Sequence, residues 1–494
     1  MDPQRVLNTQ LKQYNIMEAG IVETTYNLKA YLEGVFVARR CEIGRNDTAF
    51  VEQKRAEAFE LFSRTGFPHA ALEKWRGTDL SRALNHEYQA LPELPSADID
   101  IEKIFKCDVP HFETLLVSQL NGWYADRKNL LQVHPNGMII GSLAAAFSKY
   151  PGLVNAHYGK YADDKTDGLT ALNTAMAQDG IFIYIPDNVT VEQNIQTVNI
   201  TDFKQNLFLS TRNLVILGEN SHLRLVQCDD SINHDVTFIN SVTEVKIGRN
   251  ATLDHYKMQN KDDHTTLINS MFFHQDEGSS LSTNAISLNG GLIRNLSHVT
   301  MSGPHSNADV YGLYLMDRYQ HVDNQVFINH AAPECESREL FKGVLDDHAS
   351  GVFNGHIKVH RDAQKTNAFQ TNKNILLSDK ATIDTKPFLE IYADDVKCSH
   401  GATIGQLDPE ALFYIRSRVI SEANAKILLM YAFAADVINK ISIPELRQRM
   451  DDMVKKRLRG ELSQCEQCVL NCSTDEHQNV DFKIDIPKIG HRLQ

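Results

Sequence analysis

The chain has 494 residues, of which 42% are hydrophobic and eight are cysteine, and its formal net charge is −13. This hydrophobic content supports a large core and excludes general disorder, and the negative charge disfavours nucleic acid or a membrane surface as partner. The first residues carry no apolar signal segment, and the longest apolar runs, 137–147 and 425–438, are too short to span a bilayer. We therefore expect a soluble, cytoplasmic protein with mostly reduced cysteines.

Residues 1–150 are expected to form a mostly helical N-terminal region. The stretch "DTAFVEQKRAEAFELFSRTGFP" has apolar residues at rough helical spacing, and Gly66 and Pro68 end it as helix breakers. Shorter stretches of mixed character follow. This region therefore differs from the one that comes after it.

Residues 151–405 are expected to form a β domain. From about residue 180, short β-branched runs such as "IFIYIP", "NLVILG" and "TEVKIG" recur between turn-forming Gly, Asn and Asp. No helix-length amphipathic segment separates these runs, which excludes a βαβ arrangement and leaves a sandwich, a barrel or a solenoid. The strand number, the corner-like Gly and Asn, and the amides of 364–374, which can stack as ladders, favour a parallel β-helix.

Residues 406–460 carry helix signals with clear caps. Asp408, followed by a proline, begins a first helix, and Ser421 begins a second. The sequence "SIPE" (442–445) is a capping box that opens a third helix, which Gly460 ends. One face of this third helix is apolar and contains Leu446, Met450, Met453 and Val454. The wide apolar surface either meets a partner or docks on the protein's own core.

Motifs of several enzyme classes are missing from the sequence. There is no Walker A motif, no G-x-G-x-x-G, no H-E-x-x-H and no G-x-S-x-G, so we expect no ATP hydrolysis by this chain alone. A carbohydrate-active β-helix enzyme would need several acidic residues that converge on one face. The mixed stretch "DRYQHVDNQ" (317–325) is the nearest candidate, but a solvated strand face is the favoured interpretation.

The stretch "DDVKCSHGATIG" (394–405) contains the most informative pair of residues. In a strand, Cys398 and His400 would point to the same face, with Cα atoms about 6.6 Å apart. An iron–sulfur cluster usually takes four protein ligands, so this pair would need further ligands from a second subunit. The competing interpretation places Cys398 in the core and His400 at the end of the strand, and spacing alone favours it.

Three segments carry a resemblance to a known family. They are "GFPHAALEKWRGT" (66–78), "LNTAMAQDGIFIYIPDNVTVEQNIQ" (172–196) and the long stretch from "AQKTNAFQTNKN" to "ALFYIRSR" (363–418). Together they resemble the SufD branch of the SufB/SufD family, which belongs to the SUF iron–sulfur cluster assembly system. The order Cys-Ser-His in "KCSHGAT" separates this branch from the SufB paralogues.

The resemblance implies a mainly β fold, with a right-handed parallel β-helix core between helical N-terminal and C-terminal regions. It also implies a non-enzymatic scaffold subunit that pairs with a SufB-like paralogue through the β-helix. A SufC-like ABC ATPase would bind the C-terminal helices. His400, with Cys398 as the weaker candidate, would help to hold a transient iron–sulfur cluster at the interface between the two paralogues.

Several alternatives stay open beside this interpretation. The chain could act as a SufB-like principal scaffold or as a homodimer, and a carbohydrate-active β-helix enzyme is a more distant alternative. Whether a flavin binds the assembled complex is also left open. Neither nucleic acid nor a membrane is expected as a partner.

The tail, 461–494, contains a cluster of three thiols in "CEQCVLNC". Cys465, Cys468 and Cys472 could bind zinc or a cluster together with one outside ligand. The polar residues around them favour a mobile tail without metal. The sequence therefore gives these cysteines as a second, weaker metal-site candidate.

Overall fold

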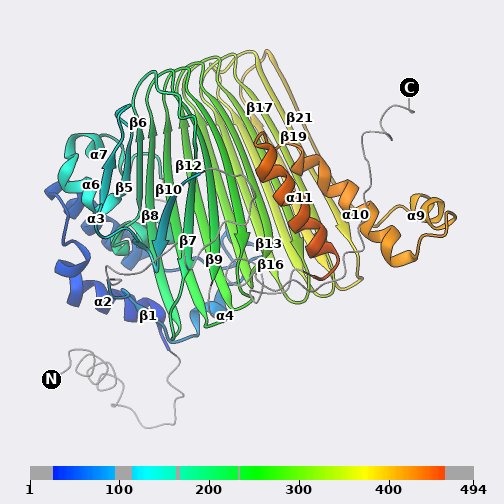
Figure 1. The fold of residues 1–494 in the computed structure, drawn as a ribbon, viewed down its shortest axis with the longest axis horizontal. Coiled ribbons are helices and arrows are strands. Elements are labelled where there is room, and N and C mark those ends of the chain that lie inside the picture. Colours follow the sequence, from blue (N-terminus) through cyan, green and yellow to red (C-terminus); the bar gives the residue numbers. More distant parts are fainter. Residues whose placement is uncertain (1–25, 95–113, 163–166, 232–233, 462–494) are drawn as a thin grey trace, which may run out of the picture.

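The protein is a parallel β-solenoid with helices on its two outer faces (Figure 1). The computed structural model describes residues 26–94, 114–162, 167–231 and 234–461. The mainly β fold and the parallel solenoid expected from the sequence are confirmed. Successive long strands alternate between two sheets, so each turn of the solenoid adds one strand to each sheet.

The first sheet is built on even-numbered parallel strands. They are β6 (Ile181–Ile185), β8 (Leu207–Leu217), β10 (Thr237–Ile247), β12 (Thr265–Gln275), β14 (Leu292–Met301), β16 (His321–His330), β18 (Ser350–Val359) and β20 (Thr382–Ile391). Two antiparallel strands, β4 (Leu131–Val133) and β5 (Ile139–Ser142), extend this sheet beyond β6, and the short β1 (Gln89–Ala90) pairs with β8.

The second sheet faces the first across the solenoid interior. Its parallel strands are β2 (Thr114–Leu120), β7 (Asn194–Thr201), β9 (His222–Ser231), β11 (Thr252–Asn260), β13 (Ser280–Asn289), β15 (Asn307–Met316), β17 (Glu336–Leu345), β19 (Thr366–Leu376) and β21 (Val396–Gly405). The short β3 (Trp123–Tyr124) pairs with β2 in the antiparallel sense and ends this sheet.

Stacked side chains hold successive turns in register. At one corner, Asn188, Asn220 and Asn250 all have positive φ, a conformation that asparagine tolerates better than most residues. The side-chain amide of Asn220 donates to Asn188 over 2.9 Å, and that of Asn250 donates to Asn220 over 3.2 Å. The corner asparagines expected from the sequence are therefore present. The amide ladder runs along this corner and not through 364–374, where Gln370 bonds to Glu339 and Asn372 to the Tyr314 hydroxyl.

An apolar stack fills much of the interior between the sheets. Leu223, Leu253, Leu281 and Ala308 occupy equivalent positions on four neighbouring strands of the second sheet, and all are buried. Burying a leucine side chain contributes roughly 1.5–3 kcal/mol. Because the same inward position is apolar in turn after turn, the pattern stabilises a long body rather than a single turn.

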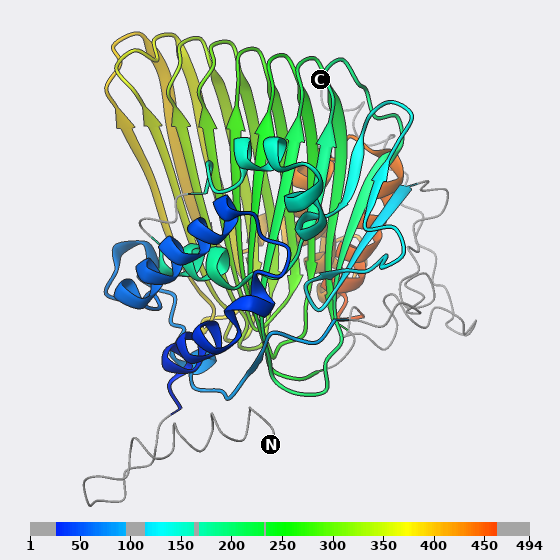
Figure 2. The same ribbon diagram turned by 90° about the vertical axis from the view of Figure 1, so that its left-hand side faces the viewer.

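The N-terminal helices cover the outer face of the first sheet (Figure 2). They are α2 (Leu28–Ile43), α3 (Ala49–Thr65), α4 (Ser81–Leu84), α6 (Leu143–Lys149), α7 (Pro151–His157) and α8 (Gly168–Met176), with a 3₁₀ turn at Glu73–Trp75. As predicted, α3 ends at Gly66, which has a φ of 67°. The expected boundary at residue 150 is less sharp, because β1 to β5 precede it and α7 and α8 follow it.

The C-terminal helices are α9 (Pro409–Arg416), α10 (Glu422–Ile438) and α11 (Pro444–Leu458). Asp408 and Ser421 cap the first two, as predicted. The predicted capping box of α11 is wrong. Its N-cap is Ile443, and Ser442 bonds instead to the Tyr256 hydroxyl, which lies 2.8 Å from its Oγ and accepts from its N–H over 3.0 Å.

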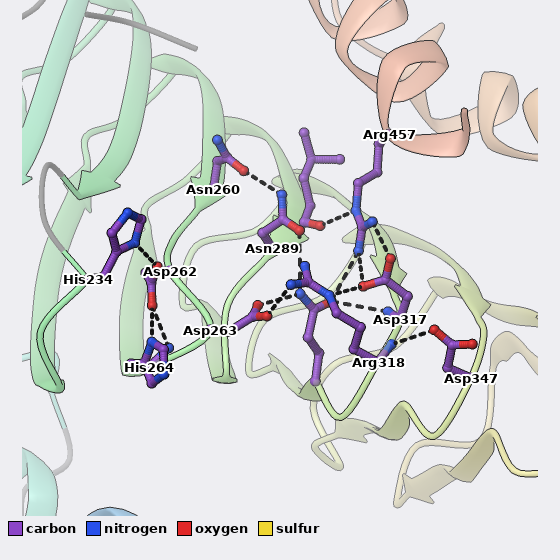
Figure 3. A network of polar contacts seen from close by, with 12 residues as sticks. His234, Asn260, Asp262, Asp263, His264, Asn289, Asp317, Arg318, Asp347 and Arg457 are labelled. Carbon is purple, nitrogen blue, oxygen red and sulfur yellow. Dashed lines mark hydrogen bonds and ion pairs between the residues drawn. The ribbon is translucent and has the colours of Figure 1, made fainter. Parts of the chain in front are cut away.

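The apolar faces of α10 and α11 pack on the outer face of the second sheet. The predicted face of α11 is buried there, so it docks on the protein's own core. Arg457 fixes the end of α11 by donating to Asp317 at 2.6 and 2.7 Å and to the Leu288 carbonyl at 2.7 Å (Figure 3). Among the described residues, no helix is long and apolar enough to cross a membrane.

Candidate functional site at the open end of the solenoid

The two ends of the solenoid differ in whether further strands pair with the last parallel strands. At the first end, antiparallel strands follow β2 and β6 and finish both sheets. At the other end, which we call the open end, the ten-residue strands β20 and β21 each pair on one side only. An unpaired edge of this length presents a row of free N–H and C=O groups to a partner.

Apolar side chains gather around these free edges. Strands β19, β20 and β21 and the loop after β20 expose large apolar residues, namely Phe369, Phe388, Ile391, Tyr392 and Ile404. Phe369 and Phe388 lie on the outer faces of opposite sheets, whereas Ile391 and Ile404 belong to the inward-facing series of the two edge strands. The open end therefore has both the hydrogen-bonding edges and the apolar contacts of an interface.

Cys398 and His400 lie on the edge strand β21. They are register partners of Ala368 and Gln370 on β19, and both partners are buried inside the solenoid. Cys398 and His400 thus share the inward-facing series of β21, and the same-face prediction is confirmed. His400 does not end the strand, however, since β21 continues to Gly405. It is exposed because no further turn covers it.

Cys398 is only half-buried and packs against the interior core. Burial raises the pKa of its thiol. The form that binds metal is the thiolate, so a nearby cation would have to favour loss of this proton. Cys398 therefore packs at the edge of the interior core, as one interpretation of the sequence expects. It also lies on the last strand at the open end, as the ligand interpretation requires.

The described residues do not complete a metal site at this end. They contain no group of three or more His, Cys, Asp or Glu side chains arranged to hold a metal ion. Cys398 and His400 would therefore depend on ligands from elsewhere. The tail cysteines Cys465, Cys468 and Cys472 lie outside the described residues, and their role stays a prediction.

Both carboxylates of the charged stretch 317–325 are engaged in ion pairs that hold parts of the fold together. Asp323 is buried and pairs with Arg294 and with the Thr78 hydroxyl, which donates over 2.6 Å. Asp317 instead pairs with Arg457 of α11. These carboxylates fasten the N-terminal and C-terminal parts onto the solenoid, so the expected solvated face is wrong for Asp323.

The sequence reasoning missed one buried polar residue near the open end, Glu339, and it expected the other, Gln370, only as one of the amides of 364–374. Glu339 on β17 and Gln370 on β19 are neighbours in register, and both face the interior. The alternation of "ESRELFKGVL" places Glu339 in the same series as the inward-facing Phe341, and this alternation is the signal that could have found it.

Two family models match most of the described residues. The family described as "SUF system FeS cluster assembly, SufBD core domain" matches residues 199–433, and "SufBD protein N-terminal region" matches residues 26–197. The chain belongs to the SufBD family. The SufBD core match spans the solenoid from β7 onward and extends into α10.

Proteins from several bacteria are similar in sequence to this chain. An iron–sulfur cluster assembly SufBD family protein of Synechocystis is 29% identical over 84% of this chain and 92% of its own length. The iron–sulfur cluster assembly protein SufD of Escherichia coli is 33% identical over 49% of this chain and 58% of its own length. SufD of Bacillus subtilis is 24% identical, with 84% of this chain and 95% of the relative covered.

Proposed function

We propose that this chain is a non-catalytic scaffold subunit of a SUF-type complex and that its open end pairs with a SufB-like paralogue. The support is the pair of unpaired edge strands β20 and β21, with apolar side chains around them. A related solenoid could add its own strands to these edges and continue both sheets. The matched family and its named relatives are described as iron–sulfur cluster assembly proteins, which supports cluster assembly as the function of the complex.

The single observation that carries the cluster role is the position of His400. It is an exposed imidazole on the inward-facing series of an unpaired edge strand, two residues from the half-buried thiol of Cys398. Imidazole and thiolate are suitable ligands for iron–sulfur chemistry. Because the set is incomplete, the remaining ligands would come from the paralogue, and the transient cluster would be cargo shared by the two chains.

The C-terminal helices offer a second surface, which we propose for a SufC-like ABC ATPase. Helix α9 buries none of its residues and projects away from the sheets (Figure 1). Phe413 is 74% exposed, Tyr414 is 61% exposed, and Val419, just after the helix, is 98% exposed. Three adjacent apolar groups in water are best explained by a partner that covers them.

Co-expression with a SufB-like paralogue and a SufC-like ATPase tests this proposal. We expect a stable complex that contains all three chains and acquires iron and acid-labile sulfide under anaerobic conditions. A chain that forms only homodimers and assembles a cluster without the paralogue would contradict the shared site and favour a principal-scaffold role.

A further inference from the structure

A column of three polar residues leads from the solenoid interior to its open end. The register pairs Glu339 of β17 with Gln370 of β19, and Gln370 with His400 of β21. Glu339 is 3% exposed and Gln370 is 2% exposed, whereas His400 is exposed to solvent. We call Glu339, Gln370 and His400 the polar column.

Glu339, the inner residue of the column, fixes the orientation of the Gln370 side-chain amide. Gln370 donates from Nε2 to Oε2 of Glu339 over 2.8 Å. Burial raises the pKa of Glu339 to about 8, so this carboxyl is neutral near pH 7 and the column has no buried negative charge there. With its nitrogen bound to Glu339, the amide has its oxygen left for another donor.

That oxygen has no partner among the described residues. Gln370 Oε1 is buried and accepts no hydrogen bond. Oε1 of Glu339, the oxygen free to carry the proton of the neutral acid, is also buried without a partner. A buried acceptor without a donor is costly, so such groups call for an explanation.

The opposite sheet makes room for the Gln370 amide. Gly355 on β18 faces it, and a Cβ at this position would lie 1.9 Å from Gln370 Nε2. A larger residue at 355 would push the amide out of its place. The fold therefore accommodates a buried amide immediately behind His400, at the last position before the open end.

Resting on the function proposed above, we infer that Gln370 and Glu339 are positioning residues for His400. In the assembled complex, a ring N–H of His400 donates to Gln370 Oε1, and the other ring nitrogen faces the shared cluster site. Neighbouring strands lie about 4.8 Å apart, which brings side chains at paired positions within reach. Histidine ligands are commonly fixed by such a second hydrogen bond, which sets both the tautomer and the ring direction.

The test compares variants of the chain in the complete complex under anaerobic conditions. Cluster formation is measured as iron and acid-labile sulfide per complex, as a function of added Fe²⁺. The first variant, Gln370→Met, keeps the volume of the side chain and removes its amide. The second, Glu339→Gln, keeps a hydrogen-bonding group beside Gln370. The third is His400→Ala, and the fourth combines His400→Ala with Gln370→Met. Gln259→Met is the matched control, because Gln259 is an equally buried interior amide on β11, far from the open end.

We expect Gln370→Met to raise the half-saturating Fe²⁺ concentration at least fivefold, while Glu339→Gln and Gln259→Met stay within twofold of wild type. In the His400→Ala background, Gln370→Met should cause no further loss, because it acts through His400. Normal Fe²⁺ dependence in Gln370→Met, or an additive loss in the double variant, would overturn the inference.

Two further outcomes are distinguishable. Normal cluster formation in His400→Ala would overturn the proposed site itself and the inference with it. Should Gln370→Met fail to fold, Glu339→Met, which removes the support of the amide, must show the same Fe²⁺ shift, and its absence would overturn the inference alone.

Discussion

His400 lies next to Gln370 in register, so an exposed imidazole at the edge of the solenoid stands directly beside a buried amide. Each parallel strand copies the side-chain direction of the strand before it. The last turn therefore presents to solvent a position that is interior in every earlier turn. This relationship explains how a packed interior residue series can end in an exposed imidazole, the position that we propose as a cluster ligand.

The ionisation of Glu339 should make the stability of the protein depend on pH. Its pKa is raised from 4.5 to about 8 in the folded chain, so the folded state keeps a proton that the unfolded state loses above about pH 4.5. The protonated carboxyl therefore contributes to the free energy of unfolding. This contribution is complete below pH 4.5 and is lost as the pH rises toward 8, at about 1.4 kcal/mol per pH unit. Glu339→Gln removes it, so the variant should gain stability relative to wild type as the pH rises.

Urea unfolding at pH 5.5 and pH 8 measures this difference. The advantage of Glu339→Gln should be larger by about 3 kcal/mol at the higher pH. Glu336→Gln, at an exposed position on the same strand, is the control. An advantage of Glu339→Gln that is equal at both values would show that Glu339 does not hold its proton in the fold.

The glycine opposite Gln370 gives a test of packing at the open end. Gly355→Ala places a methyl group against the Gln370 amide and near Phe353, and we expect a loss of about 1–3 kcal/mol in the free energy of unfolding. Gly401→Ala is the matched control, since a Cβ there meets nothing within 4 Å. Equal thermal stability of the two variants would argue against a filled space beside Gly355.

The exposed apolar residues of α9 should matter for the complex and not for the fold. We expect the double change Phe413→Ser and Tyr414→Ser to alter stability by less than about 0.5 kcal/mol, because neither side chain is buried. The same change should abolish co-purification of the ATPase. Val133→Ser, at an exposed apolar residue on β4, should leave the complex intact. Retention of the ATPase by the double variant would refute the assignment of α9.

The tail cysteines give a separate test. If Cys465, Cys468 and Cys472 bind metal, their joint replacement by serine should lower the zinc or iron content of the purified chain. The sequence favours a tail without metal, and unchanged metal content together with unchanged cluster delivery would support that prediction. Metal analysis of both proteins after the same purification is the measurement.

Local sequence patterns predicted much of the fold, because strand alternation, turns and helix caps depend on residues that are close together in the chain. Alternating β-branched runs with Asn and Gly corners indicated the solenoid, and Asp408 and Ser421 indicated the starts of α9 and α10. Ser442 failed as a cap because Tyr256, 186 residues earlier in the chain, takes its hydrogen bonds. No local pattern contains such a contact.

The candidate site was only partly predictable for a similar reason. The pair Cys398 and His400 stood out by residue type, but spacing alone favoured a strand that ends at His400. Strand β21 instead continues to Gly405 as the edge of its sheet, and this edge position depends on the stacking of distant strands. Glu339 was missed because glutamate is rarely buried without a charged partner, and only the register of three strands brings it into line with His400.

The central claim is that His400 contributes to a cluster shared with a paralogue, and the most direct measurement is iron and acid-labile sulfide per assembled complex. With His400→Ala, we expect the complex to form normally, since one exposed side chain is a small part of a large interface, and cluster content to fall sharply. Cys398→Ser should cause a milder loss. Wild-type cluster content in a complex that carries both substitutions would contradict the account.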